Sequence, residues 1–468
     1  MRTLSRSRTA GMIGVAVLAA SLSGAAVPAQ AETAQGSQAA AASNAVLDWN
    51  GYAGEAAVAA CIAPLDNPLH ESRMYAMTHL AVHDALNAID RRYQPYAYKR
   101  SAPAGASAQA AVAAAAHGVL VPVLRQLRST PFAGCVDKAV ATVEKRYAAE
   151  LAKIPNGTSE RRGVGVGRAA ARAVLALRSK DGADTLLIDT TYAEGTKPGQ
   201  WRFTPDRPFA FAPGWGKVTP FVLRSAAQHG QGRPLPLTSA RYAADVNEIK
   251  ALGGDGVMTP TRRTPQQTQV ALFWWESSPL MWNRITRTVA RDRGLDMWRS
   301  ARLFGLLDMA LADGYVGSFA TKYREPFWRP VTAIRQAHLD GNPATALDAT
   351  WTPFQVTPPI PENDSAHAVE GGAAASVLRR FFGTDRVAFR MCSVTLPTGQ
   401  ACGQTGEVRR SFNSFSQAAT ENAVSRIYIG FHFRHAVVAG TRHGELIGTR
   451  AVAAFLRPVP APPRTSRP

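Results

Sequence analysis

The sequence predicts an all-α protein built from two helical bundles that are joined by long irregular connections. Two observations carry this prediction. Apolar residues recur at spacings of three and four in several long stretches, as on the buried face of a helix. Alternating apolar and polar runs, which are typical of strands, are scarce. We place the division near residue 230, with an N-terminal helical region over 45–230 and a C-terminal bundle carrying the functional site over 231–456.

The N-terminal residues predict a signal peptide over 1–31 and a flexible leader over 32–44. Three arginines lie within the first eight residues, an apolar stretch follows, and a small-x-small pattern ends at Ala31. This is the order of charge, apolar core and cleavage site in secretory signal peptides. The leader is mainly Ala, Ser and Gln, which cannot form a packed core. We therefore expect a secreted, extracellular protein, and no later segment predicts a membrane span.

Six stretches predict helices by their apolar periodicity. In the first of them, for example, Met74, Met77, Ala81 and Ala85 would share one face. The fourth is apolar almost all round, which predicts a buried helix. The six stretches are 71–89, 108–127, 240–252, 297–323, 366–383 and 420–440.

Two other stretches predict irregular structure. Residues 186–222 are rich in Pro, Gly, Thr and Trp and predict a long irregular connection. Residues 457–468 form a Pro-rich tail, which we expect to be extended or disordered.

The formal net charge of +19 suits an anionic partner but does not identify it. The basic residues are scattered rather than gathered into runs, so we expect no nucleic-acid partner. The four cysteines, in an exported protein, favour disulfides. We expect a Cys392–Cys402 bridge, because a turn-rich stretch separates the two; Cys61 with Cys135 is a weaker second pair, because nothing local brings them together.

Three short stretches of the C-terminal region contain residues that suit anion chemistry. The first, KYREPFWRP, contains Lys322 and Arg329 around Pro326, and its prolines predict a fixed non-helical path between the two cations. Each stretch alone is weak: the first could be a basic loop that binds carboxylates, and a lone histidine is usually structural. The second and third stretches, NDSAHA and SRIYIGFH, contribute Ser365, His367, Arg426 and His432.

In combination these side chains can form a pocket for a tetrahedral or trigonal-bipyramidal oxyanion. Guanidinium groups bind two oxygens through parallel donors, and a lysine adds a compact charge. The Ser365 hydroxyl and the N–H groups at the start of the helix that follows Asp364 add neutral donors, helped by the helix dipole. One imidazole could then attack or coordinate the central atom, while the other moves protons.

The ordered pattern K-x6-R-P, S-x-H and S-R-x5-H resembles the vanadium-dependent haloperoxidases, which share their site with the type 2 phosphatidic acid phosphatases, a superfamily of acid phosphatases. The likeness extends from about Val46 to about Leu456. Longer stretches also resemble bacterial members of the haloperoxidase branch: MTHLAVHDALNAI, YAADVNEIKALG with RRTPQQTQVALFW after it, KYREPFWRPVTAIR and ENAVSRIYIGFHFR. The resemblance also implies a fold of two helical bundles.

The resemblance implies a role for each matching position. His432 would coordinate vanadium, or act as the nucleophile on a phosphate ester, and His367 would be the acid–base residue. Lys322 would also polarise the peroxide. Ala366 stands where the family usually has glycine; its N–H is retained, but its methyl crowds the pocket and disfavours a positive φ. The residues that bind vanadate or phosphate would be Lys322, Arg329, Ser365, Ala366 and Arg426.

The function implied is that of an exported haloperoxidase with vanadate as its cofactor and hydrogen peroxide and halide as its substrates. An exported acid phosphatase working through a phosphohistidine is the alternative, because phosphate and vanadate are isosteric. A third interpretation, from another class, is a catalytically silent anion-binding protein; the basic charge and Ala366 leave room for it.

Several other residues have weaker signals. His79 and His83 are spaced i, i+4, which suits zinc, but no third ligand completes an H-E-x-x-H pattern, so we interpret them as structural. We expect Trp328 and the preceding Phe327 to line the halide pocket. Two histidines that follow His432 along the same helical stretch are interpreted as structural or supporting: His435 and His443.

Overall fold

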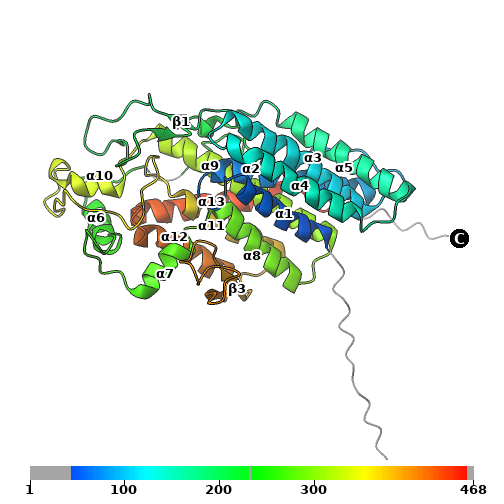
Figure 1. Cartoon of the computed structure of the whole chain (residues 1–468). Coiled ribbons are helices and arrows are strands. Elements are labelled where there is room, and N and C mark those ends of the chain that lie inside the picture. Colours follow the sequence, from blue (N-terminus) through cyan, green and yellow to red (C-terminus); the bar gives the residue numbers. More distant parts are fainter. Residues whose placement is uncertain (1–43, 231–232, 461–468) are drawn as a thin grey trace, which may run out of the picture. The chain divides into compact units, whose positions relative to one another are not determined.

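The computed structural model describes residues 44–230 and 233–460, and its regular structure is almost entirely helical (Figure 1). The prediction of an all-α fold is confirmed. The predicted signal peptide, the leader before Asn44 and residues 461–468 of the tail lie outside the described residues. The α-helices are α1 (Ala45–Ala59), α2 (Pro68–Ile89), α3 (Ala108–Gln126), α4 (Val136–Leu151), α5 (Thr158–Leu177), α6 (Ala240–Leu252), α7 (Pro265–Phe273), α8 (Ser278–Asp292), α9 (Met297–Arg324), α10 (Pro330–Arg335), α11 (Ala366–Phe382), α12 (Phe415–Tyr428) and α13 (Arg434–Ala454).

Five of the six helices predicted from periodicity are present, as α2, α3, α6, α9 and α11. Side chains at their N-termini explain several of the starting points. The Ser107 side chain accepts a hydrogen bond from the Ala110 N–H at the start of α3, and Asp296 does the same for Arg299 at the start of α9. Such caps satisfy backbone donors that have no partner inside the helix.

The stretch 420–440 is not one helix, contrary to the prediction. α12 ends at Tyr428, and α13 begins at Arg434 after a short link. Gly430 lies in this link with a φ of 88°, a conformation that glycine adopts far more readily than other residues. A Cβ at Gly430 would lie 2.5 Å from the carbonyl oxygen of Gly253, at the end of α6. Because apolar residues continue through the link, periodicity alone hides this break.

The long helix α9 lies at the centre of the core, and α2, α11 and α13 pack against it. The largest cluster of buried apolar residues combines side chains from α1, α2 and α3 with others from α9, α11 and α13. In Figure 1, α3 to α5 lie on one side of α9, and α6, α7 and α10 lie on the other. The division near residue 230 stays a prediction.

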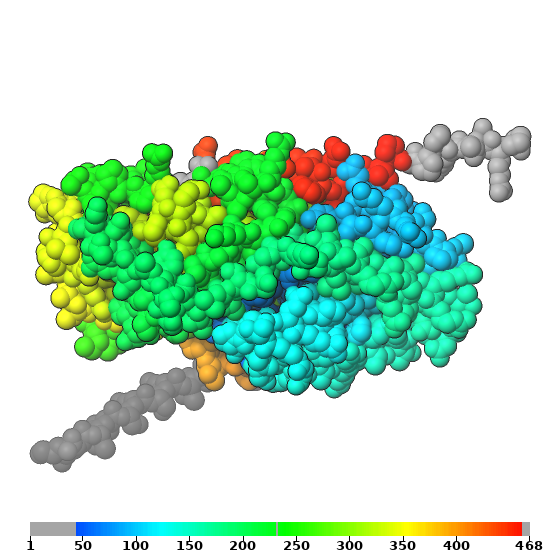
Figure 2. Space-filling model, turned by 90° about the horizontal axis from the view of Figure 1, so that it is seen from above, coloured from blue at the N-terminus to red at the C-terminus, as the bar shows by residue number. Residues whose placement is uncertain are grey.

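The predicted irregular connection is confirmed. Among the described residues between α5 and α6, the regular structure is limited to one two-residue antiparallel pair, β1 (Ile188–Asp189) with β2 (Ala210–Phe211), and one short 3-10 helix, Trp215–Lys217. In the space-filling view (Figure 2) residues near 200, in green, cover much of the visible face between helices near 120 and residues near 340. The second strand pair, β3 (Phe389–Cys392) with β4 (Arg409–Phe412), is also antiparallel.

Both predicted disulfides are present. Cys392 at the end of β3 is bonded to Cys402 with a Cα–Cα distance of 5.2 Å, and Cys61 after α1 is bonded to Cys135 before α4 at 6.0 Å. Two helical segments of the described chain are long and apolar enough to cross a bilayer, Ala108–Ser129 and Met297–Arg324. Both are mostly buried inside the protein, as core helices are.

Candidate active site

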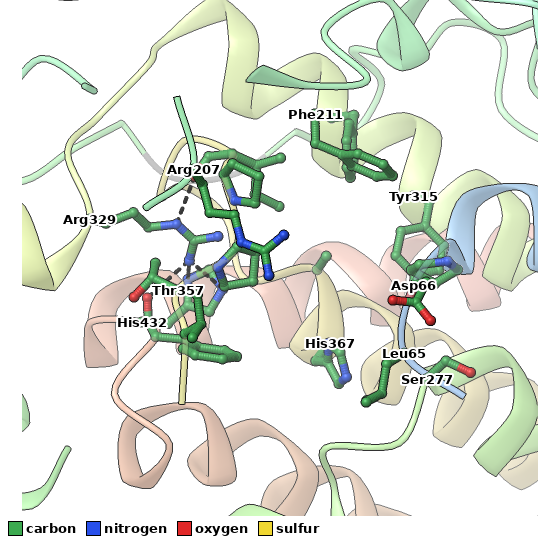
Figure 3. Close-up of a pocket in the computed structure, with 18 of the residues that line it drawn as sticks. Leu65, Asp66, Arg207, Phe211, Ser277, Tyr315, Arg329, Thr357, His367 and His432 are labelled. Carbon is green, nitrogen blue, oxygen red and sulfur yellow. Dashed lines mark hydrogen bonds between the residues drawn. The ribbon is translucent and has the colours of Figure 1, made fainter. Parts of the chain in front are cut away.

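The structure gathers all the predicted site residues around one cavity of about 410 Å³ (Figure 3). Lys322 and Ser365 are fully buried beside the residues that line it. Much of the remaining wall is apolar and includes Phe211 from the irregular connection and Phe319 from α9. The predicted residues that line the cavity are Arg329, Ala366, His367, Arg426 and His432.

The segment between the first two cations follows the predicted path only in part. Lys322 lies in the last turn of α9, which continues to Arg324, so the non-helical path begins after that residue. Pro326 lies in this path, and Pro330 is the first residue of α10. The fixed φ of proline suits the first helical position, and Arg329 is therefore held as the N-cap residue of α10.

The Lys322 ammonium is anchored by backbone oxygens. It donates to the carbonyl oxygens of Pro361 and Glu362, at 3.0 Å each. Burial, followed by the nearby Arg329 charge, lowers the pKa of Lys322 to about 7. An anion bound beside this ammonium would favour its charged form.

The Arg329 guanidinium is anchored through its Nε and Nη1 atoms. Its Nε donates to the carbonyl oxygen of Ile360 at 2.7 Å, and its Nη1 donates to that of Phe431 at 2.9 Å. Nη1 also lies 3.3 Å from the Glu362 carboxylate. Nη2 is buried and has no hydrogen-bond partner among the described residues. This unsatisfied donor suits an acceptor that is supplied from outside the chain.

Ser365 and Ala366 form the start of α11. Ser365 is the N-cap residue, and its backbone N–H donates to the carbonyl oxygen of Ala436 at 3.1 Å. Its Oγ is buried and, within the described chain, has no hydrogen-bond partner. Ala366 lines the cavity from the first helical position. The hydroxyl and the helix N-terminus therefore offer neutral donors, and the Ala366 methyl narrows the space beside them.

Arg426 comes from the last turn of α12. Its Nε donates to Ser425 Oγ at 2.9 Å, and its Nη2 donates to the carbonyl oxygen of Trp274 at 2.6 Å. Neither partner is charged. Burial lowers the pKa of Arg426 to about 9. An oxyanion in the cavity would provide the missing counter-charge.

His432 lies in the link between α12 and α13. Its Nδ1 is 3.0 Å from the Glu362 carboxylate, and its Nε2 is 2.9 Å from Arg329 Nη1. Burial, followed by the charges of Arg329 and Lys322, holds the pKa of His432 well below its usual range. The imidazole is therefore neutral, and its acceptor nitrogen faces the Arg329 guanidinium.

His367 projects from the first turn of α11 at another part of the cavity (Figure 3). Its Nε2 lies 3.4 Å from the carbonyl oxygen of Glu276. Burial, followed by the Arg426 charge, lowers the pKa of His367 well below its usual range. A neutral imidazole in this position can accept a proton.

Two charged residues of the site were missed by the sequence analysis. Glu362 is fully buried between Arg329 and His432; a signal was available, because it stands directly before the NDSAHA stretch. Arg207 lines the cavity from the irregular connection, and Figure 3 shows its side chain extending toward Arg329 and His432. No local pattern marks Arg207.

The prediction that Phe327 and Trp328 line the halide pocket is wrong. Trp328 is fully buried, and it and Phe327 pack in a separate apolar cluster that includes Tyr242 and Phe433. Neither belongs to the cavity wall. The next residue, Arg329, lines the cavity instead. Aromatic residues from more distant segments, such as Phe209 and Trp275, line the cavity in their place.

The other histidines have structural contacts. His79 Nδ1 lies 2.7 Å from Asp308, and His83 Nδ1 lies 3.1 Å from the adjacent Asp84. His443 on α13 is a neighbour of the site, because its Nδ1 lies 2.7 Å from Asp364, directly before Ser365. His435 lies on the outer part of α13, with its Nε2 3.0 Å from the carbonyl oxygen of Arg233.

The donor set fits a tetrahedral oxyanion such as vanadate or phosphate. We call Lys322, Arg329, Ser365 and Arg426 the anion cage. The cage contains three basic side chains, and the neutral imidazole of His432 lies beside it. Arg329 Nη2 and the Ser365 hydroxyl have no hydrogen-bond partner in the part of the chain that the structure describes. Buried polar groups are normally hydrogen-bonded, so these unsatisfied donors indicate a ligand with several acceptor oxygens.

Comparison with known proteins identifies the family. The family model for the vanadium chloroperoxidase N-terminal domain matches residues 34–213, and that for the second helical-bundle domain matches residues 302–460. Vanadium chloroperoxidase of Curvularia inaequalis is 29% identical over 471 residues, covering 79% of this chain and 75% of that protein.

Solved structures agree with this assignment. The crystal structure of a bacterial vanadium-dependent iodoperoxidase has a TM-score of 0.70 and 25% identity, covering 88% of this chain and 97% of that one. A holo-type bacterial vanadium-dependent chloroperoxidase shares the fold, with a TM-score of 0.65, 19% identity, and coverage of 86% and 94%. The chain belongs to the vanadium-dependent haloperoxidase family.

Proposed function

We propose that this protein is a secreted haloperoxidase that uses vanadate as its cofactor and oxidises halide with hydrogen peroxide. The reaction converts halide, hydrogen peroxide and one proton to hypohalous acid and water. The observation that carries the proposal is the anion cage, whose Ser365 hydroxyl and Arg329 Nη2 have no partner in the described chain, beside the neutral imidazole of His432.

Each residue near the cage has a task that follows from its surroundings. Lys322, Arg329 and Arg426 would bind and neutralise the oxyanion, and Ser365 would donate a hydrogen bond to it. His432 would hold it through a ring nitrogen that faces Arg329 in this structure. Vanadate, when bound, would supply Lewis-acid activation of the peroxide without a change in oxidation state. His367, across the cavity, would take up a proton and deliver it to the reaction, which consumes one proton per turnover.

Secretion is supported by two features. The basic and apolar N-terminal residues fit a signal peptide that would be removed near Glu32. Both cysteine pairs are disulfide-bonded, which is typical of proteins exported to an oxidising compartment. N-terminal sequencing of the protein recovered from the culture medium tests this part of the proposal, and an intact Met1 would contradict it.

The central experiment is a halide-oxidation assay on the purified protein with and without orthovanadate. We expect no activity in the bare protein and activity on addition of vanadate, with chloride, bromide and iodide each tried. Phosphate should compete, because it would occupy the same cage. His432→Ala should abolish activity while the circular dichroism spectrum stays unchanged.

The same preparation tests the phosphatase alternative. A phosphatase would hydrolyse a phosphate monoester without any added metal, and vanadate would inhibit it as a mimic of the five-coordinate transition state. That result, with no halide oxidation at any vanadate concentration, would replace the proposal. Anion binding without either activity would instead indicate a silent binding protein.

A further inference from the structure

The Arg426 guanidinium of the anion cage donates to the backbone of a short segment, residues 274–277 between α7 and α8, which we call the site link. Arg426 Nη2 donates to the carbonyl oxygen of Trp274 at 2.6 Å. Two residues further on, the carbonyl oxygen of Glu276 lies 3.4 Å from His367 Nε2. The position of the site link therefore affects a basic side chain of the cage and the imidazole across the cavity.

The Glu276 side chain is fully buried but does not line the cavity. Its two carboxylate oxygens accept from Arg284 Nη1, on α8, at 2.7 and 2.8 Å. Oε2 also accepts from the Val394 N–H at 3.0 Å and from the Ser393 hydroxyl at 3.2 Å. The carboxylate thus ties the site link to a segment that is far away in the sequence.

That segment begins a loop that a disulfide closes, residues 392–402, which we call the disulfide loop. Arg284 Nη2 donates to the carbonyl oxygen of Cys392 at 3.2 Å and lies 2.7 Å from Cys402 Sγ. One guanidinium therefore contacts Glu276 and both ends of the disulfide loop. A closed loop has fewer conformations than an open one, so the disulfide helps to hold these donors in place.

We propose that the disulfide loop positions Arg426 through Glu276 and the site link, so that the full anion affinity of the cage requires the Cys392–Cys402 bond. Glu276 is a positioning residue in this arrangement, because its carboxylate acts through the backbone that Arg426 contacts. Loss of the groups that orient metal-binding side chains typically weakens binding about 10- to 100-fold, and we expect an effect of this size here. The inference rests on the proposed function only for the identity of the oxyanion.

A purely structural role for Glu276 would lower the stability of the fold without a specific effect on anion binding. The site link is also held at its two ends. Trp274 Nε1 donates to Glu421 at 3.0 Å, and the Ser277 N–H donates to the carbonyl oxygen of Pro64 at 2.6 Å. Loss of the Glu276 contacts should therefore loosen the middle of the link rather than unfold it.

Asp181 provides a matched control for the loss of a buried, ion-paired carboxylate. It is buried and pairs with Arg73 at 2.8 Å and with Arg178 at 2.9 Å. None of these three residues belongs to the cage, the site link or the disulfide loop. Asp181→Asn should therefore lower the stability without changing the affinity for anions.

The experiment compares Glu276→Gln, the double variant Cys392→Ser with Cys402→Ser, and the control Asp181→Asn. Equilibrium binding of inorganic phosphate and of orthovanadate to the purified protein, without peroxide or halide, gives the affinities, and urea denaturation gives the stability. We expect Glu276→Gln to weaken the binding of both anions about 10- to 100-fold. The double serine variant should weaken binding in the same direction.

The combination of these changes tests the route. If the loop acts through Glu276, the protein with all three substitutions should bind phosphate no more weakly than Glu276→Gln alone, because the two effects share one path. A milder variant, Thr395→Val, keeps the disulfide and removes the hydroxyl that donates to the carbonyl oxygen of Leu272, at 2.8 Å, beside the site link. It should show a smaller loss of phosphate affinity.

Three outcomes would overturn the inference. One is an unchanged anion affinity in Glu276→Gln, or, if that variant does not fold, in both the double serine variant and Thr395→Val. Another is an equal loss of affinity in Asp181→Asn, which would indicate a general effect of lower stability. The third is an additive loss in the combined variant, which would exclude Glu276 as the route. If the affinities change as expected but the wild type never oxidises halide, the proposed function fails and the positioning role stands.

Discussion

The two imidazoles of the site line one cavity but have different hydrogen-bond partners. These partners indicate a different role for each imidazole. His432 is held at both ring nitrogens, by a carboxylate and a guanidinium. His367 has only a weak contact, at 3.4 Å, with a backbone carbonyl oxygen, and its ring extends into the cavity. The close contacts of His432 suit a ring with a fixed position, as a ligand needs, whereas the weakly held ring of His367 suits proton transfer.

Replacing His367 with alanine should therefore slow turnover without preventing vanadate from binding to the anion cage. Loss of a general acid–base group typically lowers the rate about 10²- to 10⁴-fold. We expect this fall in kcat, while vanadate binding at equilibrium changes only a few-fold, because His367 does not belong to the cage. Full activity of His367→Ala across the pH range would show that another group moves the proton.

At the scale of the element, the link between α12 and α13 is what places His432. The sequence revealed most helices, because their periodicity and caps are local properties. It did not reveal this link, because its cause is the approach of Gly430 to Gly253, a residue far away in the chain. The ordered motifs gave the residues of the site, but Arg207 could not be found, since it reaches the cavity only through a long irregular segment.

Gly430→Ala should damage the site as well as the stability. A positive φ costs a non-glycine residue about 1–2 kcal/mol, and the new Cβ would also lie 2.5 Å from the Gly253 oxygen. Gly399→Ala is the matched control, because Gly399 has a φ of 92° and nothing within 4 Å of the added Cβ. Chemical denaturation should show a larger loss for Gly430→Ala, and only this variant should lose vanadate binding. Equal losses with intact binding would contradict the role of the link.

At the scale of the whole molecule, the core contains carboxyl groups that the proposed reaction does not use. Glu370 on α11 is fully buried, and neither of its carboxyl oxygens has a hydrogen-bond partner within the described residues. A Cβ at Gly314 on α9 would lie 2.1 Å from this carboxyl, so the glycine makes room for it. Such burial depends on the packing of distant helices, and the sequence alone does not predict it.

This burial predicts a pH dependence of stability. Desolvation, followed by the Glu71 charge, raises the pKa of Glu370 well above its ordinary value of 4.5. The folded state therefore retains a proton that the unfolded state releases. The contribution to stability is fully present below pH 4.5 and is lost as the pH rises through the raised pKa.

Glu370→Gln tests this dependence, because the amide cannot ionise. We expect the variant to be more stable than the wild type at alkaline pH, and the difference to shrink as the pH falls toward 4.5. Urea denaturation over this pH range measures it, with Asp184→Asn as a control for the loss of one exposed carboxylate. A constant difference between wild type and Glu370→Gln at all pH values would contradict the prediction.

The donors of the anion cage that have no partner among the described residues also have a consequence for the stability of the protein in solution. A ligand that binds only the folded state stabilises it by about 2.7 kcal/mol at a concentration of 100 times its Kd. Phosphate, an ordinary nutrient, should therefore protect the protein against heat while it blocks vanadate. Melting temperatures measured across a phosphate series would test this, and Arg329→Ala should abolish the effect. The chemistry of the surrounding medium would then set both how long the protein lasts and whether it is active.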